Sequence, residues 1–190
     1  MSRPGVWPTD DGLGLDKSVV RLSPHNPDWP GLGEAECGVV TALLGDRADA
    51  VVHVGSTAVP GLDAKPILDI VAAVDDRLPI DDVVMLLCTG GEYTYEGDKR
   101  DDGGLLFVRG DGAFRTVHVH VVGRSSRAWK SYLRFHALLL DDPGARERYQ
   151  SAKRELARAF AQDRQGYTTA KSAVVEELLS ENGSQPPHVP

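Results

Sequence analysis

The feature that most constrains this chain is a segment in which two apolar runs flank a turn of small residues. The runs, at residues 50–54 and 67–71, are rich in β-branched side chains, which are typical of strands. Between them lie Gly55-Ser56-Thr57 and then Pro60-Gly61, which favour turns. The segment therefore predicts two strands joined by a turn that begins at a glycine.

The turn and the second strand both carry groups that suggest a binding site. Gly55 lets the backbone pass close to a ligand, and N–H groups at such a turn attract an anion such as phosphate. Ser56 and Thr57 add hydroxyl donors, whereas Asp69 stands alone in an apolar strand, where an unpaired charge is costly and a divalent metal would compensate it. The alternative is a structural turn with a helix cap, and an Asp69 that accepts hydrogen bonds from backbone amides.

A second strand pattern, at residues 114–122, places two imidazoles on one face. Side chains alternate along a strand, so His118 and His120 point the same way, together with Thr116 and Val122. Two histidines at this spacing suit a metal site or an acid–base pair. Spacing alone favours the alternative, a pair of polar sheet positions that bond to backbone or solvent.

The motif GSTAVPGL, followed by AKPI and by Asp69-Ile70, resembles the signature of the GrpB family. Members of that family resemble the polymerase-beta type of nucleotidyltransferase, and the resemblance extends over roughly residues 19 to 181. It implies an α/β (α+β) fold, with a nucleotidyltransferase-like mixed sheet flanked by helices and a C-terminal helical region. It also implies a transferase acting on a small polar metabolite, through nucleotidyl or phosphoryl transfer.

The same resemblance implies the site and its cofactors. Catalysis and metal binding would fall to Asp69, His118 and His120. A nucleoside triphosphate would be held by Gly55, Ser56, Thr57, Lys65 and Arg115. The metal would be Mg²⁺ or Mn²⁺, stabilising charge on the transferred phosphoryl group.

One position departs from the pattern of active nucleotidyltransferases. They usually carry Asp-x-Asp on this strand, whereas this chain has Val71 after Asp69. One carboxylate with two imidazoles suits Mn²⁺, Zn²⁺ or Fe²⁺ better than Mg²⁺, which prefers oxygen ligands. Two further hypotheses therefore stay open: an enzyme with altered chemistry on the same scaffold, and a non-catalytic nucleotide- or phosphate-binding module.

Gly, Pro and capping residues, together with the spacing of apolar residues, predict how the rest of the chain is organised. We expect a flexible arm at residues 1–17, the α/β core at 18–124, C-terminal helices at 125–182 and a disordered tail at 183–190. Helices are predicted near residues 28–44, 80–87, 125–140, 145–162 and 168–179, and a mobile loop at 96–104. Residues 146–155 carry alternating charges, Lys153 among them, and most of these charges are expected on a solvated helix face.

Composition excludes several classes of protein. A formal net charge of -7 argues against a general nucleic-acid-binding surface, which needs stripes of Lys and Arg. The two cysteines, Cys37 and Cys88, form no metal-binding motif and suggest a reduced compartment. No apolar run approaches the ~18 residues of a membrane helix. We therefore expect a cytoplasmic protein with a small-molecule or nucleotide partner; its oligomeric state does not follow from the sequence.

Overall fold

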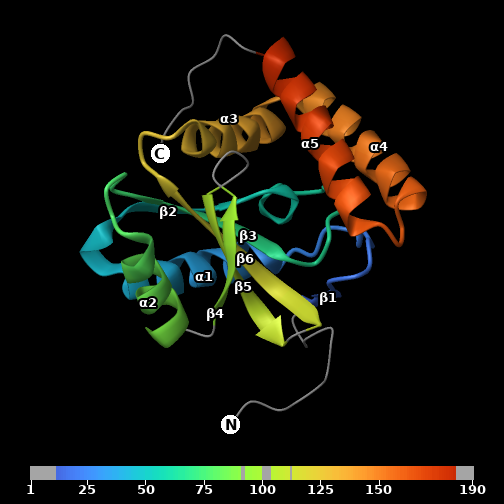
Figure 1. The fold of residues 1–190 in the computed structure, drawn as a ribbon. Helices are drawn as coiled ribbons and strands as arrows, with labels where there is room; N and C mark the ends of the chain where they lie inside the picture. Colours follow the sequence, from blue (N-terminus) through green and yellow to red (C-terminus); the bar gives the residue numbers. More distant parts are fainter. Residues whose placement is uncertain (1–11, 91–92, 100–103, 112, 183–190) are drawn as a thin grey trace.

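The computed structural model describes residues 12–90, 93–99, 104–111 and 113–182, which form a mixed sheet with helices on both faces (Figure 1). Hydrogen-bonded strands follow the order β2-β3-β6-β5-β4, and a short strand, β1, pairs with the start of β6. The strands are β1 (Leu15–Asp16), β2 (Ala48–Val54), β3 (Leu68–Val74), β4 (Tyr93–Lys99), β5 (Gly104–Asp111) and β6 (Phe114–Gly123).

The centre of the sheet is the parallel pair β3 and β6, whereas the other pairings are antiparallel. Parallel neighbours cannot be joined by a tight turn. The chain accordingly leaves β3 through helix α2 (Ile80–Gly90) and the hairpin β4–β5 before it returns as β6. The resulting register sets Asp69 opposite His118 and Val71 opposite His120.

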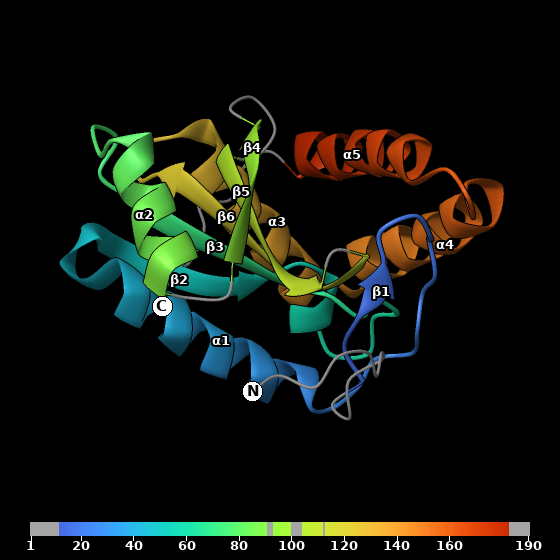
Figure 2. The same cartoon turned by 60° about the horizontal axis from the view of Figure 1, so that its bottom comes forward.

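Helices α1 (Trp29–Leu44) and α2 cover one face of this sheet (Figure 2). Side chains alternate between the two faces of a strand. The apolar residues of β3 and β6 that alternate with Asp69, His118 and His120 therefore point toward these helices. The principal core there includes Ile70, Ala72, Val119 and Val121 from the strands, with Val40, Leu44, Val83 and Leu87 from the helices.

Three C-terminal helices lie on the opposite side: α3 (Arg127–Asp141), α4 (Pro143–Ala159) and α5 (Arg164–Glu181). Each begins at a side-chain cap, supplied by Ser126, Asp142 and Asp163, which accept backbone N–H bonds of the first turn. The cap at Asp163 explains why α5 begins at Arg164 rather than near residue 168. The helices share a small core with Val59 and Leu62 of the segment between β2 and β3.

The described part of the predicted N-terminal arm is docked on the sheet. Leu13 and Leu15 are 5% and 4% exposed, and Leu15 pairs with Arg115. Burial of the two leucines stabilises residues 12–17 in this position. The Gly- and Asp-rich composition of the segment had suggested flexibility instead. Residues 1–11 and the predicted tail at 183–190 lie outside the described residues.

A second difference concerns the predicted loop at residues 96–104. Strand β4 continues to Lys99, with a register shift between Tyr95 and Asp98. The shift is a bulge that includes the glycine at position 97, whose φ of 106° is a conformation that glycine adopts readily. Charge and glycine content suggested a loop, whereas pairing with β5 makes the segment an edge strand; residues 100–103 lie outside the described residues.

The predicted fold class is confirmed: a mixed sheet flanked by helices, with a C-terminal helical region. Among the described residues, no helix combines the length and the apolar character needed to cross a membrane.

Gly33 provides a test of how α1 packs on β2. A Cβ at this position would lie 2.0 Å from Nδ1 of His53, the imidazole on which the helix rests. We therefore expect Gly33→Ala to lower the free energy of unfolding by about 1 to 3 kcal/mol, as overpacked sites do. Urea unfolding would measure it.

The matched control is Gly38→Ala on the same helix, where an added Cβ meets no atom within 4 Å. That variant should gain up to about 1 kcal/mol from helix propensity. Equal stability of the two variants would contradict the close packing of α1 on His53.

Candidate functional site

Asp69, His118 and His120 lie together on the face of the sheet that carries the C-terminal helices. The parallel pairing of β3 with β6 brings Asp69 beside His118, and alternation keeps His120 on the same face. One ligand atom from each residue lies within 4.8 Å of the other two. The strand parity expected from the sequence is therefore what the structure shows; the roles of these residues remain predictions.

The contact between Asp69 and His118 fixes the proton on the imidazole. Nδ1 of His118 lies 3.1 Å from Oδ1 of Asp69. Since a carboxylate can only accept, Nδ1 carries the proton and donates it. The other ring nitrogen, Nε2, is buried and has no hydrogen-bond partner among the described residues. Nε2 is therefore unprotonated, and its lone pair accepts no hydrogen bond from the described residues.

The charge states of the pair suit a ligand or metal site. Burial alone would raise the pKa of the Asp69 carboxyl, but the hydrogen bond that His118 donates and the charge of Lys171 hold that pKa well below its usual range. Burial lowers the pKa of His118 and outweighs the attraction of Asp69. At neutral pH the site thus holds an ionised carboxylate beside a neutral imidazole, and the Asp69 side chain is still 33% exposed.

His120 lies between His118 and helix α3. Its ring centroid is 6.3 Å from that of His118 and 5.2 Å from that of Tyr132. An imidazole packed between two rings has little rotational freedom, so His120 is held in place before any ligand binds.

The turn after β2 approaches Asp69 from the other side. Gly55 adopts φ 76°, and a Cβ there would lie 2.8 Å from Oδ2 of Asp69. The glycine is thus required twice, by its backbone conformation and by the closeness of the carboxylate. Ser56, the next residue, accepts a hydrogen bond of 3.0 Å from Nζ of Lys153.

Thr57, a predicted ligand contact, points away from the site. Its side chain is 1% exposed, and its hydroxyl lies 2.9 Å from Nε2 of His53. The hydroxyl therefore joins the turn to β2. Sequence spacing could not show this, because consecutive residues of a short 3-10 turn project in different directions.

Lys65 and Arg115, the predicted phosphate contacts, differ in their partners; Asp69 acts on the charge of Lys65. Lys65 has its Nζ 5.1 Å from the centroid of the Tyr167 ring. Arg115 forms an ion pair of 2.9 Å with Glu96 on β4. Burial, with a smaller contribution from Lys171, lowers the pKa of Lys65 to about 7.

The structure adds three cationic residues that sequence analysis had not placed at the site: Lys153 on α4, and Arg164 and Lys171 on α5. Lys153 is 2% exposed, so its expected place on a solvated face is wrong. A signal was present, because Tyr149 precedes Lys153 by four positions and Tyr167 precedes Lys171 by four. Residues four apart share a helix face, so each helix carries a Tyr–Lys pair on one side.

Val71 occupies the position where active nucleotidyltransferases have a second carboxylate. It is fully buried and packs with Val54 and Val122, while Trp129 and Tyr132 of α3 lie against the same cluster. The departure seen in the sequence is thus part of a hydrophobic contact between the sheet and α3.

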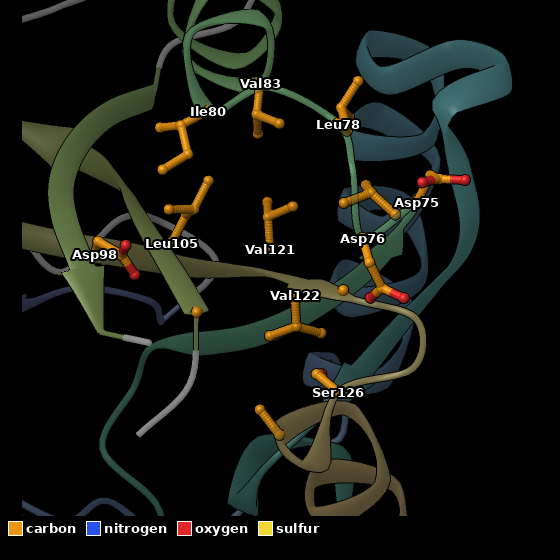
Figure 3. Close-up of a pocket in the computed structure, with 14 residues that line it drawn as sticks. Asp75, Asp76, Leu78, Ile80, Val83, Asp98, Leu105, Val121, Val122 and Ser126 are labelled. Atoms are coloured by element: carbon orange, nitrogen blue, oxygen red, sulfur yellow. The ribbon is translucent and has the colours of Figure 1, made fainter. Parts of the chain in front are cut away.

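A separate hollow of about 240 Å³ lies at the other end of β3 and β6 (Figure 3). Its walls are mainly apolar, including Leu105 and Val121, and acidic side chains lie at its rim. Two of these are already engaged: Asp75 bonds Arg77 and Arg124, and Asp76 accepts from the backbone N–H of residue 125. The hollow contains none of the predicted site residues.

These features define an α/β protein with a carboxylate–imidazole centre beside a glycine-serine turn. The family described as GrpB protein matches residues 19–181, and the chain belongs to that family. A UPF0157 protein from Streptomyces coelicolor is 36% identical, over 96% of this chain and 94% of its own length. The chain is also 28% identical, over 83% of its length, to a dephospho-CoA kinase from Mycolicibacterium paratuberculosis, of which it covers 44%.

Among solved structures, the crystal structure of conserved protein GrpB from Enterococcus faecalis is similar with a TM-score of 0.73. It is 25% identical, covering 86% of this chain and 100% of that one. A weaker likeness, with TM-score 0.49 and 17% identity over 88% of this chain and 62% of the other, is to terminal uridylyl transferase 4 from Trypanosoma brucei with bound dUTP.

The packing of Val71 predicts the outcome of restoring the missing carboxylate. Val71→Asp would place a charge in a closed apolar cluster, so we expect a loss of about 3 to 5 kcal/mol in the free energy of unfolding. Urea unfolding with and without Mg²⁺ measures both the loss and any recovery. Val71→Ala, which leaves a cavity but adds no charge, is the control and should lose less.

We expect Mg²⁺ to leave the stability of Val71→Asp unchanged. Recovery of wild-type stability on addition of Mg²⁺ would contradict this, because it would mean that a carboxylate at position 71 can reach the ion despite the packing of α3.

Proposed function

We propose that this protein is a nucleotidyltransferase-like enzyme that transfers a nucleotidyl or related phosphoryl group to a small polar metabolite. The observation that carries the proposal is the convergence of Asp69, His118 and His120 beside the Gly55–Ser56 turn. Each part has a use in such a reaction: the turn and its neighbouring cations suit phosphate, and the carboxylate and imidazoles suit a divalent ion or a proton.

The three central residues fit a divalent metal by their chemistry. Metal ligands must be deprotonated, and the site offers an ionised carboxylate and a buried Nε2 of His118 that lacks a protein partner in the described chain. One oxygen and two nitrogen donors favour Mn²⁺, Zn²⁺ or Fe²⁺ over Mg²⁺. A bound divalent ion would supply charge stabilisation at the transferred phosphoryl group.

The remaining roles belong to the protein itself. Backbone N–H groups at Gly55 and Ser56 would orient phosphate oxygens, while Lys65 and Arg115 would neutralise their charge. Asp69 holds His118 in one tautomer by accepting its Nδ1 proton. The same contact leaves Nε2 of His118 able to take a proton from an acceptor hydroxyl, an assignment that does not need a metal.

Two-metal catalysis does not suit this site. Bridging two ions needs carboxylates that reach both of them, and Val71 removes one at the usual position. A reaction with one ion, or with the Asp69–His118 pair as base, fits the side chains better. Weak transfer with Mg²⁺ alone is therefore the expected behaviour.

The alternative is a non-catalytic nucleotide- or phosphate-binding module. The observation that favours it is the hydrophobic cluster around Val71, which closes the sheet where catalytic relatives of this fold place a carboxylate. Turnover separates the two functions, since a module would bind nucleotide and metal without releasing pyrophosphate or nucleoside diphosphate.

Asp69→Asn tests the metal part of the proposal. The substitution keeps the shape of the side chain but removes its charge. Loss of a residue that only hydrogen-bonds to a metal ligand lowers metal affinity roughly 10- to 100-fold, so calorimetric titration should show Mn²⁺ or Zn²⁺ affinity falling by at least that factor. The matched control is Asp46→Asn, at a carboxylate whose side chain is 96% exposed. Equal affinities in the two variants would show that any metal binds elsewhere.

Turnover is the test of the reaction. Wild type, incubated with nucleoside triphosphates and a panel of polar acceptors, should release pyrophosphate if a nucleotidyl group is transferred, or nucleoside diphosphate if a phosphoryl group is transferred. Release should be faster with Mn²⁺ than with Mg²⁺. Because one relative carries the name dephospho-CoA kinase, the panel includes dephospho-CoA. Release that survives Asp69→Asn would remove this site from the reaction, and binding without release by wild type would favour the module.

A further inference from the structure

Three lysines surround the candidate site without carboxylate partners. Lys65, from the segment between the 3-10 turn and β3, Lys153 of α4 and Lys171 of α5 form the lysine cluster. Within the described part of the chain, none of them makes an ion pair with a carboxylate, although arginines elsewhere do, as Arg154 does with Asp63 at 2.7 Å and Arg109 with Glu36 at 2.7 Å. In an acidic protein with many carboxylates, this grouping needs a cause.

The neighbours of Lys153 hold its ammonium group in place, but none of the groups that it contacts carries a negative charge that would neutralise it. Its ammonium group donates to Ser56 Oγ and to the backbone carbonyl of Asp63, and lies 4.8 Å from the centroid of the Tyr149 ring. These are dipoles and a ring face, and no oxygen among them is ionised. A buried charge compensated only in this way is costly.

Lys65 is in a similar position on the other side of the cluster. Its ammonium group lies over the Tyr167 ring, and the charged groups that act on it are Lys171, Asp69, Arg164 and Arg115. Three of these four are positive. Asp69 is the one anion, and it already accepts a hydrogen bond from His118.

Burial and Lys171 weaken the charge of the other two lysines, whereas Tyr149 and Asp69 hold the pKa of Lys171 above its usual value. Burial, followed by the charge of Lys171, lowers the pKa of Lys153 to about 7, and Lys65 behaves likewise. The groups acting on Lys153 besides Lys171 are Asp63, which raises its pKa, and Arg154, which lowers it. Near neutral pH, both lysines are thus poised to gain a proton when an anion enters.

We propose that the lysine cluster binds a phosphate group with two negative charges on the ligand, such as a phosphate monoester or the end of a pyrophosphate. Three ammonium groups from three different elements match a tetrahedral anion with several charged oxygens better than they match a carboxylate, which has one charge and two oxygens in a plane. Ser56, held by Lys153, adds a hydroxyl at the edge of the cluster.

The placement also assigns an orientation to the ligand. A dianionic phosphate is repelled by Asp69, so it lies on the side of Lys153 and the α4–α5 pair, with the reacting part of the ligand toward Asp69 and His118. In Figure 1, α4 and α5 lie side by side beside the turn that joins β2 to β3, as this orientation needs. The inference deepens the proposed function and rests on it only for the position of the ligand, not for the reaction.

The test uses inorganic pyrophosphate as the probe, titrated calorimetrically into the full chain in EDTA so that no metal contributes. Wild type should bind pyrophosphate at least about tenfold more tightly than acetate, as expected for charge-assisted bonds to several ammonium groups. Lys65→Met, Lys153→Met and Lys171→Met keep side-chain length and remove the charge. Each should weaken pyrophosphate binding by about tenfold or more.

Lys130→Met is the control, since Lys130 is an exposed lysine on α3 outside the cluster. It should bind pyrophosphate as wild type does. Because removing a buried, unpaired charge relieves a cost, Lys153→Met without ligand should be at least as stable as wild type in urea. If that variant fails to fold, the half-buried Lys171 provides the same test.

Proton uptake is the second readout. Sulfate remains a dianion from pH 5 to 9, so its titration at about pH 8 in buffers of different ionisation enthalpy reports protons taken up by the protein. Uptake should occur in wild type and fall in Lys65→Met and Lys153→Met. Binding of pyrophosphate no tighter than that of acetate, or equal binding by the three variants and the control, would overturn the inference.

The outcomes separate this inference from the proposed function. Tight pyrophosphate binding without any turnover would leave the lysine cluster assigned and overturn the transfer reaction. Transfer from a nucleoside triphosphate at the wild-type rate in all three methionine variants would do the reverse.

Discussion

The parallel pairing of β3 with β6 is the interaction on which the site depends. It joins residues 49 positions apart, Asp69 and His118, in one hydrogen bond, and it holds His120 on the same face. The pairing is stabilised from behind, because the alternate residues of both strands, such as Ile70 and Val119, are buried under α1 and α2. The polar centre is therefore positioned by an apolar core, as is usual where precise geometry is needed.

The second constraint is electrostatic and comes from the other end of the chain. Asp69 lies in β3, but the cations that act on it come from the loop at Lys65 and from Arg164 and Lys171 of helix α5. A protein with net charge -7 has thus concentrated positive groups around one carboxylate. Low-dielectric surroundings strengthen such local fields, so the net charge of the whole chain does not describe the charge around Asp69.

The same face of the sheet serves two purposes. At Asp69 it is polar and partly open, whereas at Val71, two residues on, it packs against α3. The C-terminal helices therefore both complete the site with Lys153 and Lys171 and close the position where a second carboxylate would stand. A carboxylate at position 71 would have no room unless α3 moved.

Much of the site could be predicted because it depends on local rules. The parity of His118 and His120, the strand around Asp69 and the close approach at Gly55 all follow from residue type and spacing, which act between near neighbours. Other features had no local signal strong enough to read. Thr57 looked like a donor until its bond to His53 was seen, and Lys153 looked like a surface charge until α4 packed on the β2–β3 turn. Burial of a side chain depends on which distant surface covers it, and that is settled only when the whole chain has folded.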